Sequence, residues 1–243
     1  MKLIKEFFDH EQDLSAAAAK FITDLAIKSI SSTGRFVIAL SGGKTPSILY
    51  NLLAHPPYVD ELPWKNIFVF WSDERCVPAD DESNNSNLAR KMLLNHVPIP
   101  TENIFPVQVQ MIPPKAAIQY EQMMKAFFKE EHPSFDLILL GMGEDGHTAS
   151  LFPGTEKLWE STEQLVKEIE VPGQQIRRIT FTPTLINNAK NVMFLVTGKN
   201  KARILNDVLS NKSKTKRYPV QHIKPTGKTY WYIDEEAGAI LKL

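Results

Sequence analysis

One stretch of the chain, residues 135–153, joins a continuous apolar run to a glycine-rich loop. The run Leu137 to Leu140 contains only aliphatic side chains, which is typical of a central parallel strand covered on both faces. Gly141, Gly143 and Gly146 follow it, and glycine lets the backbone turn sharply where a strand ends. Because ligands of open α/β sheets bind at the carboxyl ends of strands, this stretch predicts a functional loop.

The same loop carries an acid and a histidine two residues apart. His147 can take up and return a proton near neutral pH, and Asp145 could hold its ring. For a lone Asp-Gly-His sequence, a helix cap and a tight turn would be the simpler interpretation. The three glycines after a buried strand favour the catalytic interpretation.

Segments of helical and strand periodicity alternate along the rest of the chain. Strands are predicted at residues 35–40, 67–71, 135–141, 176–181, 191–196 and 229–233, the last closing the sheet. Helices are predicted at residues 13–30, 84–95, 114–130, 183–189 and 199–209, with a further apolar helix after residue 45. This alternation predicts a doubly wound α/β fold, with a mostly parallel sheet and helices on both faces. We expect one domain over residues 1–243.

Composition and charge narrow the class of protein. Hydrophobic residues make up 43% and charged residues 23% of the chain, as in an ordinary globular protein, and the formal net charge is zero. We therefore expect neither nucleic acid nor a membrane as a partner. No apolar segment reaches the ~18 to 20 residues that span a bilayer, and the first ten residues resemble no targeting peptide. The single cysteine, Cys76, and the scattered histidines predict no disulfide, no metal site and a cytoplasmic location.

A second loop follows the predicted strand at 35–40. Its residues are Ser41, Gly42, Gly43, Lys44 and Thr45, and an apolar helix comes after them. Such a loop can direct backbone N–H groups and the positive end of a helix at a phosphate. The spacing matches neither the P-loop nor the dinucleotide fingerprint, so nucleotide binding is not expected. A helix cap with a tight turn is the equally weighted alternative.

Two more segments bring charged groups to strand ends. Asp73 and Arg75 follow the predicted strand at 67–71, and Arg75 could bind an anion or a developing oxyanion with its planar guanidinium. Arg178 and Lys201 lie near later strand ends, where cations could complete an anion site. A salt bridge for Arg75 and plain surface charge for the other two cations are the alternatives.

Taken together, these motifs resemble the 6-phosphogluconolactonase branch of a sugar-phosphate enzyme family. The resemblance covers nearly the whole chain, and residues 143–153, Gly-Glu-Asp-Gly-His-Thr-Ala-Ser-Leu-Phe-Pro, are its most specific part. It implies a fold shared with glucosamine-6-phosphate deaminases and ribose-5-phosphate isomerases. It also implies no cofactor, and a small-molecule sugar-phosphate lactone as the substrate.

The resemblance and the residues together predict a mechanism. His147 would remove a proton from a water that attacks the lactone carbonyl and would return it to the ring oxygen, while Asp145 orients His147. Arg75 would stabilise the oxyanion or fix the sugar hydroxyls. The phosphate and the sugar would be held by Ser41, Gly42, Gly43, Lys44, Thr45, Asp73, Arg178 and Lys201.

Two rival functions stay open, together with the oligomeric state. The sister deaminases carry a glutamate five residues after the loop histidine, where this chain has Phe152, and that difference disfavours an isomerase or deaminase. A sugar-phosphate sensor is the other rival, but the chain has no basic helix or spare length for a DNA-binding module. We expect a monomer or a weak homodimer.

Overall fold

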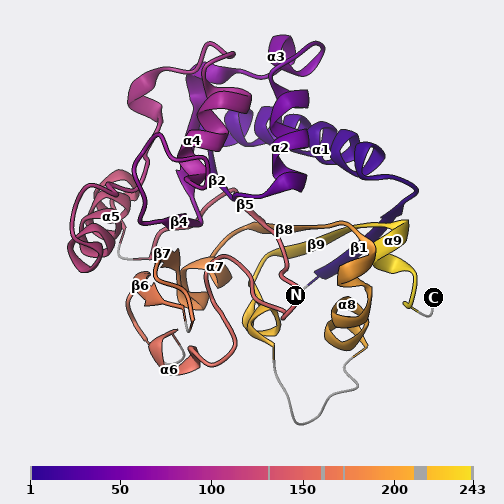
Figure 1. Ribbon diagram of the computed structural model, residues 1–243. Helices are drawn as coiled ribbons and strands as arrows, with labels where there is room; N and C mark the ends of the chain where they lie inside the picture. Colours follow the sequence, from indigo (N-terminus) through magenta and orange to yellow (C-terminus); the bar gives the residue numbers. More distant parts are fainter. Residues whose placement is uncertain (1, 131, 160–161, 172, 211–217, 242–243) are drawn as a thin grey trace.

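The computed structural model describes residues 2–130, 132–159, 162–171, 173–210 and 218–241 (Figure 1). Its strands are β1 (Lys2–Phe8), β2 (Phe36–Leu40), β3 (Ile67–Trp71), β4 (Asp73–Arg75), β5 (Leu137–Leu140), β6 (Val166–Glu170), β7 (Arg177–Phe181), β8 (Asn191–Val196) and β9 (Lys228–Asp234). Its α-helices are α1 (Glu11–Thr33), α2 (Lys44–Leu53), α3 (Tyr58–Glu61), α4 (Asn85–Ala89), α5 (Pro113–Phe128), α6 (Glu156–Trp159), α7 (Pro183–Asn187), α8 (Ala202–Leu209) and α9 (Glu235–Gly238). The helix predicted at 84–95 is α4 continued by a π-helical turn, Arg90–Leu94.

Six strands form one sheet in the order β1-β9-β8-β5-β2-β3, and every pair in it is parallel. The doubly wound α/β fold predicted from the sequence is confirmed. One detail of the prediction is wrong, because β9 does not close the sheet. The edge is β1, a strand that alternation did not reveal because five of its seven side chains are exposed.

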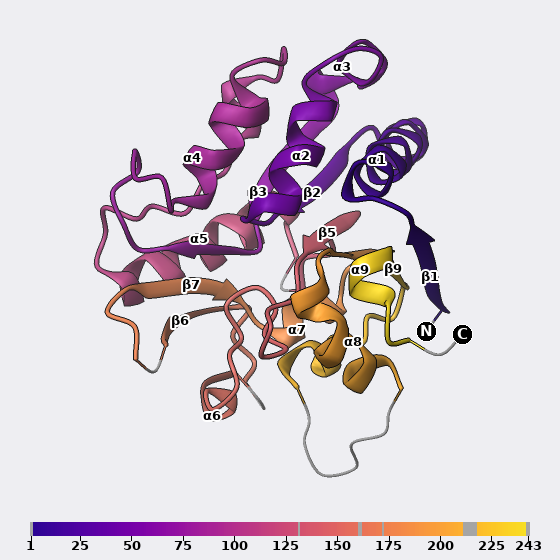
Figure 2. The ribbon, with the colours of Figure 1, turned by 45° about the vertical axis from the view of Figure 1, so that its right-hand side comes forward.

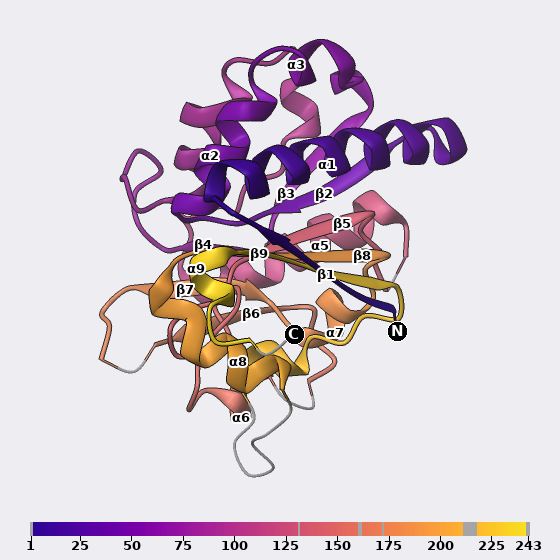
Figure 3. The same ribbon diagram turned by 90° about the vertical axis from the view of Figure 1, so that its right-hand side faces the viewer.

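The two faces of the sheet are covered by different layers (Figures 1 and 2). Alternate residues of β2, such as Phe36 and Ile38, pack with α1 and α2, while Val37 and Ala39 pack with α5 on the opposite face. Figure 3 shows α1 and α2 together on one face, with α6, α7 and α8 on the other. Full coverage explains why β2 and β5 read as continuous apolar runs.

A second, antiparallel sheet of three short strands lies beside the main one, in the order β4-β7-β6. The sequence analysis placed the strand at 176–181 in the main sheet, and that assignment is wrong. Ser72 separates β3 from β4, and its N–H donates to the Leu40 carbonyl at 2.8 Å while its own carbonyl accepts from Phe181 N–H. The small sheet is therefore attached where β2 and β3 end.

The order of the main sheet creates a topological switch point. From β2 the chain proceeds outward to β3, whereas from β5 it proceeds the other way to β8 and β9. The loops after β2 and β5 thus diverge at their carboxyl ends, which is where open α/β sheets bind ligands.

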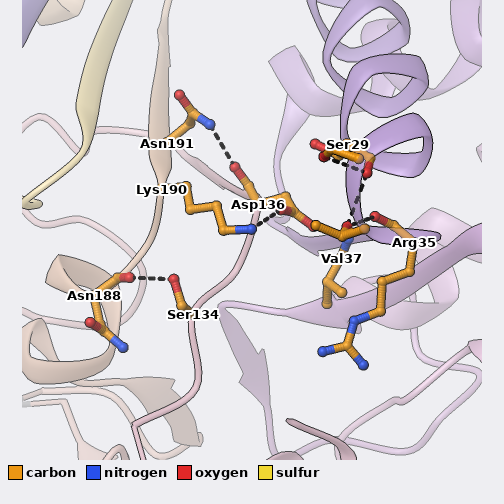
Figure 4. A network of polar contacts seen from close by, with 10 residues as sticks. Ser29, Arg35, Val37, Ser134, Asp136, Asn188, Lys190 and Asn191 are labelled. Carbon is orange, nitrogen blue, oxygen red and sulfur yellow. Dashed lines mark hydrogen bonds and ion pairs between the residues drawn. The ribbon is translucent and has the colours of Figure 1, made fainter.

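The opposite, amino-terminal edge of the sheet is tied together by Asp136 (Figure 4). Its buried carboxylate accepts from Val37 N–H and from Lys190 Nζ, both at 2.8 Å, and its carbonyl accepts from the Asn191 side chain at 2.9 Å. These contacts join β2, β5 and β8 where the strands begin. No helix in the described part of the chain combines the length and the apolar character needed to cross a bilayer.

Candidate active site

A cavity of about 620 Å³ lies at the carboxyl edge of the main sheet. Residues that follow β1, β2, β5 and β8 contribute to its wall, and so do β4 and β7 of the small sheet. Among the residues predicted from the sequence, the following line it: Ser41, Gly42, Gly43, Lys44, Thr45, Asp73, Arg75, His147, Arg178 and Lys201. Asp145, which was also predicted, does not line the cavity but contacts His147, which does.

Asp145 and His147 form a close pair in the loop after β5. The distance from Nδ1 of His147 to Oδ1 of Asp145 is 2.6 Å, and the same oxygen accepts from the backbone N–H of His147 at 3.1 Å. Partial burial would raise the pKa of Asp145, but the hydrogen bonds and the charge of His147 outweigh it and lower that pKa to about 2. Asp145 is therefore an ionised acceptor at neutral pH. Nδ1 must carry the proton of this bond, which leaves Nε2 as the basic nitrogen.

The ring of His147 rests on Phe152. Their ring centroids are 4.3 Å apart with an interplanar angle of 25°, and Phe152 is buried. The guanidinium carbon of Arg178 lies 5.3 Å from the centroid of the Phe152 ring. Phe152 thus connects the candidate base with a candidate anion-binding residue, at the position where the deaminases carry an acid.

Arg75 and Arg178 are directly opposite each other in the β4–β7 pairing. Arg75 donates from Nη1 to the Ser83 carbonyl at 2.7 Å, and Arg178 donates from Nη2 to Oε1 of Gln174 at 2.9 Å. In the described structure neither guanidinium makes an ion pair with a carboxylate. Burial and the neighbouring charge of Arg75 lower the pKa of Arg178. Two positive charges without a paired carboxylate on one wall are suited to an anionic ligand.

The Ser41–Thr45 loop is held from behind by Tyr50 of α2. The buried Tyr50 hydroxyl donates to the Ser41 carbonyl at 2.6 Å and accepts from the Ser41 N–H at 3.1 Å. Gly43 precedes α2 with a φ of 111°, a conformation that favours glycine. The Thr45 and Thr197 hydroxyls lie 2.7 Å apart, so they connect this loop to the end of β8.

The two predicted lysines of the site are held differently. Lys44 is largely exposed and pairs with Glu11 at 3.2 Å, across the start of α1. Lys201 ends the turn that precedes α8, and that turn is anchored by Asp234, whose carboxylate accepts from Gly198 N–H at 3.0 Å. Both lysines reach the cavity wall.

Asp73 is buried and held by two residues that the sequence analysis did not single out. Its Oδ2 accepts from the Ser150 hydroxyl at 2.7 Å, and its carbonyl accepts from the Asn85 amide at 2.9 Å. A Cβ on Gly42 would lie 1.9 Å from Oδ1 of Asn85, so Gly42 makes room for that amide. The sequence signal for Asn85 was weak: the polar run at residues 80–87 predicts a solvated loop and a helix cap with one asparagine reaching the site, but it does not say which asparagine.

Glu74, next to Asp73, is fully buried and was also missed. Its carboxylate accepts from the N–H groups of Arg75, Asn85 and Ser86 at 2.7 to 2.8 Å. Burial raises the pKa of Glu74 to about 7, although the three N–H donors act in the opposite direction. Glu74 therefore fixes the backbone that carries Arg75 against the start of α4.

Four residues of the cavity wall have a buried side-chain atom without a hydrogen-bond partner. These atoms are Oγ of Ser41, Nε of Arg75, Oδ1 of Asn85 and Nε of Arg178. Buried polar atoms are nearly always paired in folded proteins, so unpaired ones gathered at one cavity indicate a place for a ligand. No group of three or more His, Cys, Asp or Glu side chains placed to hold a metal ion occurs among the described residues.

Comparison with known proteins identifies a family and several relatives similar to this chain. The family described as glucosamine-6-phosphate isomerases/6-phosphogluconolactonase matches residues 9–231. A 6-phosphogluconolactonase of Synechocystis sp. is 40% identical over 96% of both chains, and one of Nostoc sp. is 40% identical over 100% of both. The solved 6-phosphogluconolactonase from Trypanosoma cruzi has a TM-score of 0.86 and 31% identity, covering 100% of this chain and 97% of that one. A monomeric glucosamine-6-phosphate deaminase, 20% identical with a TM-score of 0.80, shares the fold.

Proposed function

Because the chain belongs to the glucosamine-6-phosphate isomerase/6-phosphogluconolactonase family, we propose that it hydrolyses 6-phospho-D-glucono-1,5-lactone to 6-phospho-D-gluconate, the second step of the oxidative pentose phosphate pathway. The observation that carries the proposal is that His147, paired with Asp145, lines a cavity that Arg75 and Arg178 also line. An ester carbonyl needs a proton acceptor and a group that stabilises the oxyanion, and these residues supply both.

In the proposed reaction His147 acts first as a base and then as an acid. The oxygen of a water forms a bond to C1 while one proton of that water moves to Nε2. The π electron pair of the carbonyl moves onto the carbonyl oxygen, which becomes the oxyanion. When the tetrahedral intermediate collapses, the bond between C1 and the ring oxygen breaks and the ring oxygen takes the proton from Nε2. Asp145 keeps the Nδ1 proton in place throughout, so Nε2 is free for both transfers.

The rest of the cavity is suited to the charged end of the substrate. Arg75 is proposed to stabilise the oxyanion or to fix the sugar hydroxyls. The phosphate is proposed to bind at the loops joined by the Thr45–Thr197 contact, with Lys44, Arg178 and Lys201 supplying charge. Asp73, held by Ser150, is proposed to accept a hydrogen bond from a sugar hydroxyl.

The experiment follows the decay of lactone freshly produced by glucose-6-phosphate dehydrogenase, with spontaneous hydrolysis at the same pH subtracted. We expect wild type to accelerate the decay and His147→Ala to lose roughly 10²- to 10⁴-fold in kcat, the usual contribution of a general acid–base group. His96→Ala removes a histidine outside the cavity wall and should keep full activity.

Three results would count against this proposal. Decay no faster than the blank would exclude the lactone as substrate, and full turnover by His147→Ala would exclude the mechanism. Ammonia release from glucosamine 6-phosphate would favour the deaminase instead. The expected cytoplasmic location and the monomer or weak homodimer stay predictions, and sedimentation velocity tests the latter.

A further inference from the structure

Gly143 stands out among the glycines of the loop after β5, because its backbone does not require glycine. The sequence suggested that Gly141, Gly143 and Gly146 all serve to turn the chain. Of these three, only Gly146 has a positive φ, at 79°. Conformational freedom therefore explains Gly146, whereas Gly143 needs another reason to lack a side chain.

That reason is the space above its Cα. A Cβ on Gly143 would lie 2.0 Å from Nδ1 of His147, 2.2 Å from Cε1 of the same ring and 2.7 Å from Oδ1 of Asp145. Two of these three atoms are the ones joined by the 2.6 Å hydrogen bond between His147 and Asp145. A Cβ on Gly141, two residues earlier, would meet nothing within 4 Å. The restriction is thus specific to position 143 and to that hydrogen bond.

The surroundings of the pair leave it little room to shift in place. Gly143 donates its N–H to the His147 carbonyl at 2.8 Å, and its own carbonyl accepts from Gly146 N–H at 3.1 Å, so the loop backbone is closed on itself. The stacked ring of Phe152 contacts His147 as well. The side chain of His147 is 31% exposed, so a displaced ring would move toward the cavity and away from Asp145.

We infer that Gly143 is a positioning residue of the active site, whose missing side chain seats the His147 ring against Asp145. The effect of Gly143 on catalysis rests on the proposed function. Its effect on the contact between Nδ1 of His147 and Oδ1 of Asp145 does not, and it can be tested without substrate. A methyl group at position 143 would displace the His147 ring from Asp145. Without that hydrogen bond the ring proton could occupy either nitrogen, so Nε2 would no longer be held as the basic nitrogen.

The first test is NMR of the unliganded protein with ¹⁵N-labelled histidine. We expect wild type and Gly143→Ala both to fold, with the Nδ1–H signal of His147 present in wild type and lost in Gly143→Ala, and Gly141→Ala to keep it. With lactone as substrate, kcat of Gly143→Ala should fall about 100-fold, the usual effect of a displacement near 1 Å, while KM stays close to wild type. Retention of both the Nδ1–H signal and kcat in Gly143→Ala would overturn the inference.

A second test measures stability and applies even where Gly143→Ala is strongly destabilised. The alanine is introduced into His147→Ala as well, where the ring is gone and the added Cβ has space. We expect Gly143→Ala to lower the urea midpoint in the wild-type background and to lower it much less beside His147→Ala. Equal losses in the two backgrounds would show a cause other than the ring and would refute the role of Gly143. Absence of lactonase activity in wild type would instead refute the proposed function and leave both of these measurements valid.

Discussion

The buried polar groups at the two edges of the main sheet differ in whether they have hydrogen-bond partners. At the amino-terminal edge, the Asp136 carboxylate is satisfied by Val37 and Lys190, and none of the residues labelled in Figure 4 has a buried side-chain atom without a partner. At the carboxyl edge, Arg75 and Arg178 each leave a buried Nε unpaired beside the cavity. Strands β2, β5 and β8 run between the two edges, and Ser72 attaches the small sheet that carries both arginines where β2 and β3 end.

The difference separates stability from function. In a closed network, as at Asp136, every buried polar group has a partner within the protein. Such a network lowers the free energy of the folded state and leaves no group free to bind a ligand. An open network accepts the cost of unpaired groups until a ligand supplies the partners. Asp136 precedes β5 and Asp145 follows it, so a single strand of four residues has one acid in the network at the amino-terminal edge and one acid, paired with His147, at the edge with the cavity.

Asp145→Asn should produce the largest effect. The amide would no longer be an obligatory acceptor for Nδ1 of His147, so the ring tautomer would be released and kcat should fall about 10³-fold, or roughly 4 kcal/mol of transition-state stabilisation. Since Asp145 is half exposed, the urea midpoint should barely change. Steady-state kinetics and urea titration of the same preparation check both parts. A variant with full kcat would remove Asp145 from the mechanism.

Glu74→Gln should remove a pH dependence of stability. The folded state holds the Glu74 pKa at about 7, above its ordinary value of 4.5, so the folded protein keeps a proton between these pH values that the unfolded chain releases. Stability from this group is present below pH 4.5 and lost as pH rises to 7, by about 3 kcal/mol. Urea titrations at pH 5 and pH 7.5 should show that loss in wild type, with the Gln variant lacking it. Parallel profiles would show that the three N–H donors keep Glu74 ionised throughout.

Sequence reasoning worked best where local pattern and burial agree. The bounds of β3 and β8 match the prediction because β3 is apolar throughout and β8 is apolar after Asn191. The family, the enzyme class and the α/β fold are confirmed by the relatives. It failed for β1, which is exposed, and for β4, which has only three residues.

The candidate site likewise has a part that the sequence predicted and a part that it did not. Glycine, acid and histidine in one loop are visible in the sequence, so the Asp145–His147 pair could be predicted. The contacts of Ser150 with Asp73 and of Asn85 with Gly42 join segments 77 and 43 residues apart, and no local pattern encodes them. The roles assigned to the cavity residues stay predictions for the variants to test.

Asp136→Asn should lower stability without changing catalysis. The amide keeps one acceptor but turns an N–H group toward Val37 N–H or Lys190 Nζ, which are themselves donors, and the charge pair is lost. We expect the free energy of unfolding to fall by about 2 kcal/mol, less than for a fully buried pair because Lys190 is half exposed. Activity assays below the new midpoint should give an unchanged kcat. A parallel fall in kcat would mean that the two edges of the sheet are coupled.

Arg178→Met, with Arg177→Met as its control, should show the smallest effect and test whether the unpaired atoms await a ligand. The two arginines are adjacent on β7, but Arg177 is already paired with Glu168 at 2.7 Å and lies outside the cavity wall, whereas Arg178 has a buried Nε without a partner. Loss of the proposed charged contact between Arg178 and the phosphate should raise KM for the lactone about tenfold, near 1.4 kcal/mol, with kcat little changed. Calorimetry with 6-phosphogluconate should show the same loss of affinity. Because the control removes an equal charge from the same strand, a similar rise in KM for Arg177→Met would reduce the effect to general electrostatics, and an unchanged KM for Arg178→Met would leave its unpaired nitrogen without a function.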